Sequence, residues 1–226
     1  MANKDLTLEK NTEKSVEGFI NRNRKVLLSI IGLIVVAAVA VSVYFIVSSN
    51  ATKKALDDIS TIEYTYLKNA TDLSDEDVSA RQSAAMASLD PYLAKKNVAG
   101  VRANMLAADI AFSKEDYTSA AGYYLKAAEA GKKSYTAPVC YYNAAVTSEE
   151  LGNNEDAVKY YEMAVGYGEF LLKSHTLFSL GRVYEEMGNY EEAGKFYQKL
   201  VNEYTDSWTN LANSRLIALR SQGKIL

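Results

Sequence analysis

Residues 175–197, HTLFSLGRVYEEMGNYEEAGKFY, carry the clearest indication of how this chain folds. The first half of this stretch places apolar and small residues at helical spacing: Leu177, Leu180, Gly181 and Tyr184. Gly188-Asn189 then interrupts this pattern, and Ala193 and Tyr197 follow four residues apart, on one face of a second helix. The stretch therefore predicts two short helices joined by a tight turn.

The second half of this pattern recurs twice earlier in the chain. Alanine and tyrosine lie four residues apart at 120–124, 157–161 and 193–197, with spacings of 37 and 36 residues. Gly152 and Gly188, at the expected turns, are 36 residues apart, and Glu115 takes the corresponding place in the first unit. Such a period is typical of an array of helix pairs. We expect units at 101–134, 138–171 and 174–207.

These units resemble the tetratricopeptide repeat (TPR), a helix–turn–helix of 34 residues. The third unit carries the strongest match, through Leu177-x2-Leu180-Gly181-x2-Tyr184 and Ala193-x3-Tyr197. The first unit is the weakest, because its first-helix sites are Asn104, Ala107, Ala108 and Ala111. All three units lack the terminal proline that is usual in the repeat.

The packing expected inside each unit follows from residue size. Small residues on the first helices should meet alanines on the second helices, where the backbones approach closely: Ala108, Ala145 and Gly181 against Ala120, Ala157 and Ala193. The repeat tyrosines should fill the wider space beyond, with their hydroxyls at the solvated rim. This arrangement explains part of the excess of 17 tyrosines over six phenylalanines.

Further helices are expected on both sides of the repeats. Residues 51–96 suit two helices, one over 51–69 and one from Asp75 to about Lys96 that Pro91 kinks or splits. Ser74 resembles the cap of the second. A last helix, from about Ser207 to Gln222 in the capping segment 208–226, should cap the open end of the array through one apolar stripe: Trp208, Leu211, Ala212, Leu216 and Leu219.

Residues 26–47 form an apolar block without a charged residue. A helix of 22 residues is about 33 Å long, enough to cross a hydrocarbon core about 30 Å thick. A cleaved signal peptide is the competing interpretation, but its apolar core would be 7–15 residues long. We therefore predict an all-α protein with one N-terminal transmembrane helix at 26–47 and a TPR-type α-solenoid over 101–207.

Charge asymmetry predicts the orientation of this anchor. The arm 1–25 has six basic and four acidic residues, whereas 48–226 has 19 and 24. The positive-inside bias then keeps the arm in the cytoplasm and translocates the domain. Val16, Phe19 and Ile20 suit either a short interfacial helix or a solvated arm with a few apolar residues.

The composition gives little support for catalysis or metal binding. The single Cys140 excludes an intrachain disulfide and a cysteine-cluster metal site, and we expect it to be a buried thiol. His175, the single histidine, lacks a catalytic partner in the sequence, and no phosphate-binding or metal motif is present. The net charge of −3 disfavours nucleic acid. We expect no enzyme activity, cofactor, metal or small-molecule substrate; an enzyme site between helices would depend on His175 and scattered carboxylates.

Binding of proteins is the function that remains. In the TPR family the first helices line a groove that binds peptides. When the units of this chain are aligned with the family pattern, the groove positions fall at i, i+3, i+7 and i+10 of each first helix, which is one helical face. The candidate groove residues are Arg102, Met105, Asp109 and Phe112; Val139, Tyr142, Val146 and Glu149; and His175, Phe178, Arg182 and Glu185. Either these residues bind peptide or several of them are core between repeats. Arg182 could grip a carboxylate through two hydrogen bonds.

The layout as a whole resembles the YfgM-like group, ancillary TPR subunits of the bacterial SecYEG translocon. The resemblance rests on an arm with Val16, Phe19, Asn23 and Lys25, one span, and a helical TPR domain. It implies an inner-membrane protein whose periplasmic domain helps to chaperone newly translocated proteins. It also implies contact with a periplasmic peptidyl-prolyl isomerase and a role of the arm in stress regulation. The alternative is an anchored TPR receptor that faces the cytosol and docks targeting signals.

Overall fold

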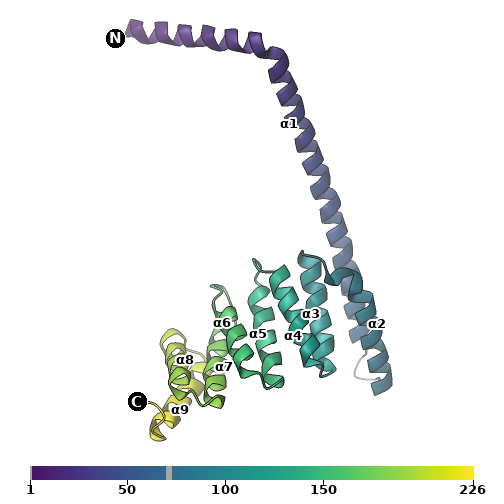
Figure 1. Ribbon diagram of the computed structural model, residues 1–226, viewed down its shortest axis with the longest axis vertical. Helices are drawn as coiled ribbons and strands as arrows, with labels where there is room; N and C mark the ends of the chain where they lie inside the picture. Colours follow the sequence, from purple (N-terminus) through teal and green to yellow (C-terminus); the bar gives the residue numbers. More distant parts are fainter. Residues whose placement is uncertain (1, 70–72) are drawn as a thin grey trace. The chain divides into compact units, whose positions relative to one another are not determined.

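The computed structural model describes residues 2–69 and 73–226, with side chains from residue 17 onward, and every regular element in these residues is a helix (Figure 1). The side chain of Val16, part of the expected apolar strip of the arm, lies outside the described side chains. The chain divides into two compact units, residues 1–51 and 52–226.

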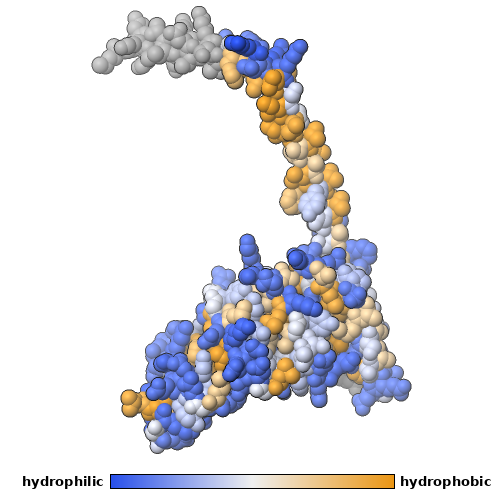
Figure 2. Space-filling model, in the orientation of Figure 1, coloured by the Kyte–Doolittle hydropathy of each residue, from blue (hydrophilic) through white to orange (hydrophobic). Residues whose placement is uncertain are grey.

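Helix α1 (Ala2–Leu67) is continuous, and the separate helix expected over 51–69 is the last part of it. The reason is local: residues 48–51 are Ser-Ser-Asn-Ala, which contain neither proline nor glycine to end a helix. Within the apolar block, the Ser42 hydroxyl donates to the Ala38 carbonyl at 2.8 Å, so this polar group is satisfied inside the helix. The apolar side chains of the block are exposed (Figure 2). Glu17–Leu67 is long and apolar enough to cross a membrane, with a window of mean hydropathy 3.0.

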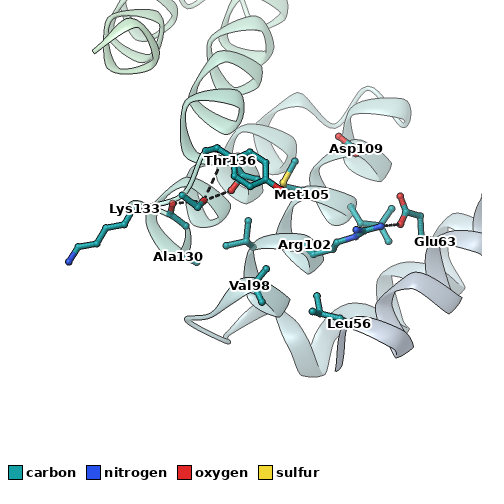
Figure 3. A pocket seen from close by; sticks show the side chains of 14 residues that line it. Leu56, Glu63, Val98, Arg102, Met105, Asp109, Ala130, Lys133 and Thr136 are labelled. Carbon is teal, nitrogen blue, oxygen red and sulfur yellow. Dashed lines mark hydrogen bonds and ion pairs between the residues drawn. The ribbon is translucent and has the colours of Figure 1, made fainter. Parts of the chain in front are cut away.

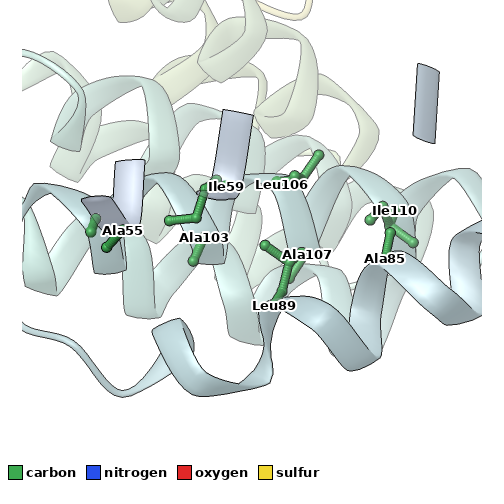
Figure 4. Close-up of a cluster of buried hydrophobic side chains, with 9 residues drawn as sticks. Ala55, Ile59, Ala85, Leu89, Ala103, Leu106, Ala107 and Ile110 are labelled. Carbon is green, nitrogen blue, oxygen red and sulfur yellow. The ribbon is translucent and has the colours of Figure 1, made fainter. Parts of the chain in front are cut away.

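The second unit begins with the end of α1 and helix α2 (Asp75–Leu93), which build a core with helix α3 (Val98–Ser113) (Figure 4). Ile59 and Leu89 are fully buried there against Ala103 and Ala107. Ser74 caps α2, because its hydroxyl accepts the Asp77 amide at 3.2 Å. Pro91 lies in the last turn of α2, three residues before the C-cap at Ala94, and the helix ends at Leu93 instead of continuing to Lys96.

Three helix pairs follow, as the repeats predict. They are α3 with α4 (Tyr117–Ala130), α5 (Ala137–Glu150) with α6 (Asn154–Val165), and α7 (Lys173–Glu186) with α8 (Tyr190–Glu203). Each pair turns through a residue with positive φ: Glu115 at 60°, Gly152 at 70° and Gly188 at 75°. The residue after each turn caps the next helix with its side chain: Asp116, Asn153 and Asn189. The Glu115 turn therefore has the same backbone form as the two glycine turns.

Packing within the repeats confirms the expected close approach of small residues. Ala108 and Ala120 share one buried cluster, and Ala145 and Ala157 share another. In the third repeat, a Cβ atom on Gly181 would lie 2.4 Å from Cε1 of Tyr197. Gly181 therefore makes room for the Tyr197 ring, whereas the first two repeats have alanine at this position.

Helix α9 (Ser207–Ser221) packs on α8 and closes the array at this end. Its N-terminus carries a capping box between Asp206 and Thr209. Ala212, Leu216 and Leu219 are buried in one cluster with Leu177 and Leu200 of the third repeat. This agrees with the capping role predicted from the sequence, although Leu211 of the expected stripe is exposed.

Candidate functional site

Three of the four candidate residues of the first repeat line one pocket. Arg102, Met105 and Asp109 on α3 face a cavity of about 640 Å³ (Figure 3). Phe112, the fourth, instead packs edge-on against Tyr117, with ring centroids 5.2 Å apart.

The pocket lies between the end of α1, α3 and the loop from α4 to α5. Its apolar lining comes from both helices and includes Leu56, Val98, Val101, Met105 and Leu106. Val98 and Tyr135, which belong to this lining, are 56% and 84% exposed. Exposed large apolar side chains that gather at a cavity are typical of a binding surface.

The charged groups of the pocket differ in whether they have an ionic partner. Arg102 donates to the Glu63 carboxylate at 2.7 Å, which ties α3 to α1. Asp109 accepts a hydrogen bond from the Tyr124 hydroxyl at 2.5 Å, and no cation pairs with it among the described residues. Although Asp109 keeps an exposed surface, partial burial raises its pKa, the Tyr124 hydrogen bond opposes this shift, and the nearby charge of Glu63 adds to it. Asp109 is therefore an acidic group whose charged form lacks a counter-ion.

In the second and third repeats, the candidate residues meet one another across helices. The Tyr142 hydroxyl lies 3.1 Å from Nδ1 of His175, and the His175 ring stacks on Trp208 of α9 with centroids 3.8 Å apart. Phe178 lies against Trp208 as well, at 5.4 Å. Tyr142, His175 and Trp208 thus form an aromatic column across α5, α7 and α9.

The acidic candidates of these two repeats are paired within the molecule. Glu149 accepts a hydrogen bond from the Tyr161 hydroxyl and forms an ion pair with Arg182 of the next repeat. Glu185 pairs in the same way with Arg215 of α9, whose Nε lies 3.0 Å from Oε1. Arg182 is therefore already bound to Glu149, and also to Glu186 at 2.7 Å, rather than free to grip a partner.

The pKa values reflect these contacts. Burial lowers the pKa of His175, and the positive charge of Arg182 adds to the shift. Burial alone would raise the pKa of Glu185, but hydrogen bonds from Arg215 and Tyr197 outweigh it, so its pKa lies below the ordinary value. Near neutral pH the fold therefore favours the neutral form of His175 and the charged form of Glu185.

The remaining two candidates, Val139 and Val146, are half-buried and pack against the core clusters of their repeats. They fit the interpretation that part of the candidate face is core. The repeat tyrosines differ from expectation, because the Tyr124 and Tyr161 hydroxyls donate to carboxylates on the first helices.

Sequence reasoning missed Glu63, Trp208 and Arg215 as partners of this face. A signal for Trp208 is present: Tyr142, His175 and Trp208 are spaced by 33 residues, which is also the separation of Glu149 and Arg182, whereas Arg215 lies 30 residues after its partner Glu185. This spacing marks residues that neighbour each other across successive helices. Glu63 lies outside the repeats, so no regular spacing identifies it.

The described residues offer no cluster of His, Cys, Asp and Glu that could hold a metal ion. Cys140 is fully buried, as predicted, and its pKa is raised to about 12 by burial first and then by the charge of Asp109. A thiol in this state is a poor nucleophile.

Comparisons with known proteins agree with the repeats. Tetratricopeptide-repeat models match residues 83–135, 139–167 and 175–207. The chain is therefore a tetratricopeptide repeat protein, a class of interaction module.

A TPR repeat-containing protein of Treponema pallidum (strain Nichols) is 28% identical to this chain over 150 residues. The match spans 65% of this chain and 63% of that relative's length. Among solved structures, MamA is similar over 66% of this chain and 83% of its own, with 16% identity and a TM-score of 0.50. The apo form of RapI is similar over 81% of this chain and 77% of its own, with 19% identity and a TM-score of 0.50. These two structures support the helical repeat fold.

Proposed function

We propose that this chain is a membrane-anchored scaffold that binds segments of other proteins through its TPR domain. One observation carries the proposal: an uncharged and exposed apolar segment, 26–47, precedes an array of TPR helix pairs in the same chain. An anchored binding domain raises the local concentration of its partners at the membrane.

The proposal extends to a place and a role. Positive charges before the segment favour an inner-membrane protein with its N-terminus in the cytoplasm and its domain in the periplasm. There the domain would act as a chaperone-like subunit in protein translocation or envelope protein biogenesis, as the YfgM-like layout implies. Its partners would be unfolded clients, a translocon subunit or a periplasmic isomerase.

Cysteine labelling in intact bacterial cells tests the topology. The buried Cys140 gives a low background, so a new cysteine can be placed at Leu171, which is 98% exposed between α6 and α7. A matched variant, Gly18→Cys, reports on the arm. We expect an impermeant maleimide to label Leu171→Cys in intact cells and Gly18→Cys after lysis. The reverse pattern would replace this proposal with the cytosol-facing receptor.

Photo-crosslinking in native membranes tests the role. A photoreactive side chain at Tyr135 should give adducts with translocon subunits or with newly exported proteins. The matched position is Asp90, exposed on α2 and outside the pocket. Adducts that are equal in number and kind at both positions would contradict a chaperone-like role.

A further inference from the structure

The pocket at the first repeat differs from the rest of the candidate face in which of its acids form ion pairs. In the second and third repeats, the acids Glu149 and Glu185 are each bound by an arginine of a following helix. In the first repeat, Phe112 takes the place that corresponds to these acids, and Val146 takes the place of Arg182. Asp109 itself takes the place that corresponds to Arg182, so the first repeat has an acid where the third has an arginine, and no arginine pairs with Asp109 among the described residues.

Asp109 lies beside a second acid. Glu63 is close enough to raise the pKa of Asp109, and Arg102 neutralises Glu63 from one side. Figure 3 shows Glu63 and Asp109 on the same side of the pocket, whereas Lys133 points away from the cavity. A cation that entered here would neutralise Asp109 and relieve its repulsion with Glu63.

Next to this acidic edge, the pocket offers apolar surface. Leu56, Met105 and Leu106 line its inner part, and Val98 and Tyr135 extend apolar surface to its exposed rim. A cavity of about 640 Å³ is large enough for one or two large side chains.

We propose that this pocket binds a peptide segment of a partner in which a large apolar side chain lies within a few residues of a lysine or arginine. The apolar side chain enters between α1 and α3, and the cation pairs with Asp109 at the edge. The proposal deepens the proposed function and rests on it, because it names the chemistry of the segment that the scaffold binds. The chemistry of the partner follows from charge complementarity, because Asp109 is an exposed acid that lines the pocket and no cation pairs with it among the described residues.

A phage-displayed library of random 12-residue peptides, selected on the full chain in lipid nanodiscs, tests this inference. Enriched peptides are synthesised, and their affinities are measured by fluorescence anisotropy. We expect them to carry Lys or Arg within about three positions of Leu, Met, Phe or Trp. Asp109→Asn keeps the size and the acceptor for Tyr124 but removes the charge, and it should weaken binding about tenfold.

Two further variants make the test specific. Tyr135→Ser shortens an exposed rim residue and should weaken binding severalfold without an effect on folding. Asp90→Asn removes an exposed aspartate on α2 and should bind as the wild type does. Far-UV circular dichroism and thermal unfolding establish that each variant is folded.

The outcomes separate this inference from the proposed function. Peptides that bind the wild type and Asp109→Asn equally well, or that are enriched in acidic residues, would overturn the inference and leave the scaffold function standing. If no peptide from the selection binds the wild type, the scaffold function loses support as well. Tenfold weakening by Asp109→Asn, with no change by Asp90→Asn, would establish the site.

Discussion

The turn at Glu115 leads to a prediction of increased stability. Glu115 has φ of 60°, a left-handed conformation that the other two repeats give to Gly152 and Gly188. The backbone hydrogen bonds of the three turns correspond: the amides of Asp116, Asn153 and Asn189 bond to the carbonyls five residues earlier at 3.0, 2.9 and 2.8 Å. Glu115→Gly should therefore relieve strain without a change in the turn.

The magnitude follows from two opposing effects. A left-handed conformation costs an L-residue about 1–2 kcal/mol. A new glycine costs about 0.4–1 kcal/mol through the greater entropy of the unfolded chain. The difference is a gain of about 1 kcal/mol in the free energy of unfolding. For a unit of the size of residues 52–226, this corresponds to a rise of about 3 °C in the melting temperature.

Urea unfolding of the full chain in detergent, followed by circular dichroism at 222 nm, measures this change. Glu115→Ala is the matched control, because it removes the carboxylate but keeps the strained Cβ, and we expect it to change stability by less than about 0.5 kcal/mol. Gly152→Ala should lower stability by about 1 kcal/mol, by the same reasoning in reverse. If Glu115→Gly destabilised the protein as much as Gly152→Ala does, the equivalence of the turns would be refuted.

Three other predictions concern the third repeat and the buried thiol. Gly181→Ala should destabilise the protein by about 1–3 kcal/mol in urea unfolding, because its Cβ would overlap the Tyr197 ring; an unchanged midpoint would show that the ring moves aside freely. His175 has a lowered pKa, so its neutral form is favoured in the fold; stability should fall as pH drops below about 6.5, its unfolded pKa, and His175→Gln should flatten this dependence in melting curves from pH 7.5 to 5.5. Cys140 should react with a maleimide only after denaturation, and rapid labelling of the native protein would contradict its burial.

Much of this fold could be predicted from the sequence because its information is local and repeated. The spacing of Ala120, Ala157 and Ala193 indicates the helix pairs, and the glycine turns set the register. The continuity of α1 was not predicted: the apolar block ends at residue 47 and the next expected helix begins at residue 51, but residues 48–50 contain nothing that would interrupt the backbone.

The candidate site could be predicted only in part. Helical periodicity identifies the face of α3, α5 and α7, but it does not say which side chains of other helices meet that face. The partners of Arg102 and Glu185 come from α1 and α9, which are outside the periodic pattern. From the sequence, Arg182 is therefore predicted to be available for a partner's carboxylate, whereas in the structure it forms an ion pair with Glu149.

Helix α9 also bears on how this array could change its length. Arg215 pairs with Glu185 as Arg182 pairs with Glu149, in each case an arginine of a following helix bound to the last acid of the candidate face, at separations of 30 and 33 residues. The capping helix therefore presents to α7 the same joint that the first helix of another repeat would present. A tandem duplication of one repeat before α9 would recreate this joint at each new boundary, so the array could gain a repeat without a new cap.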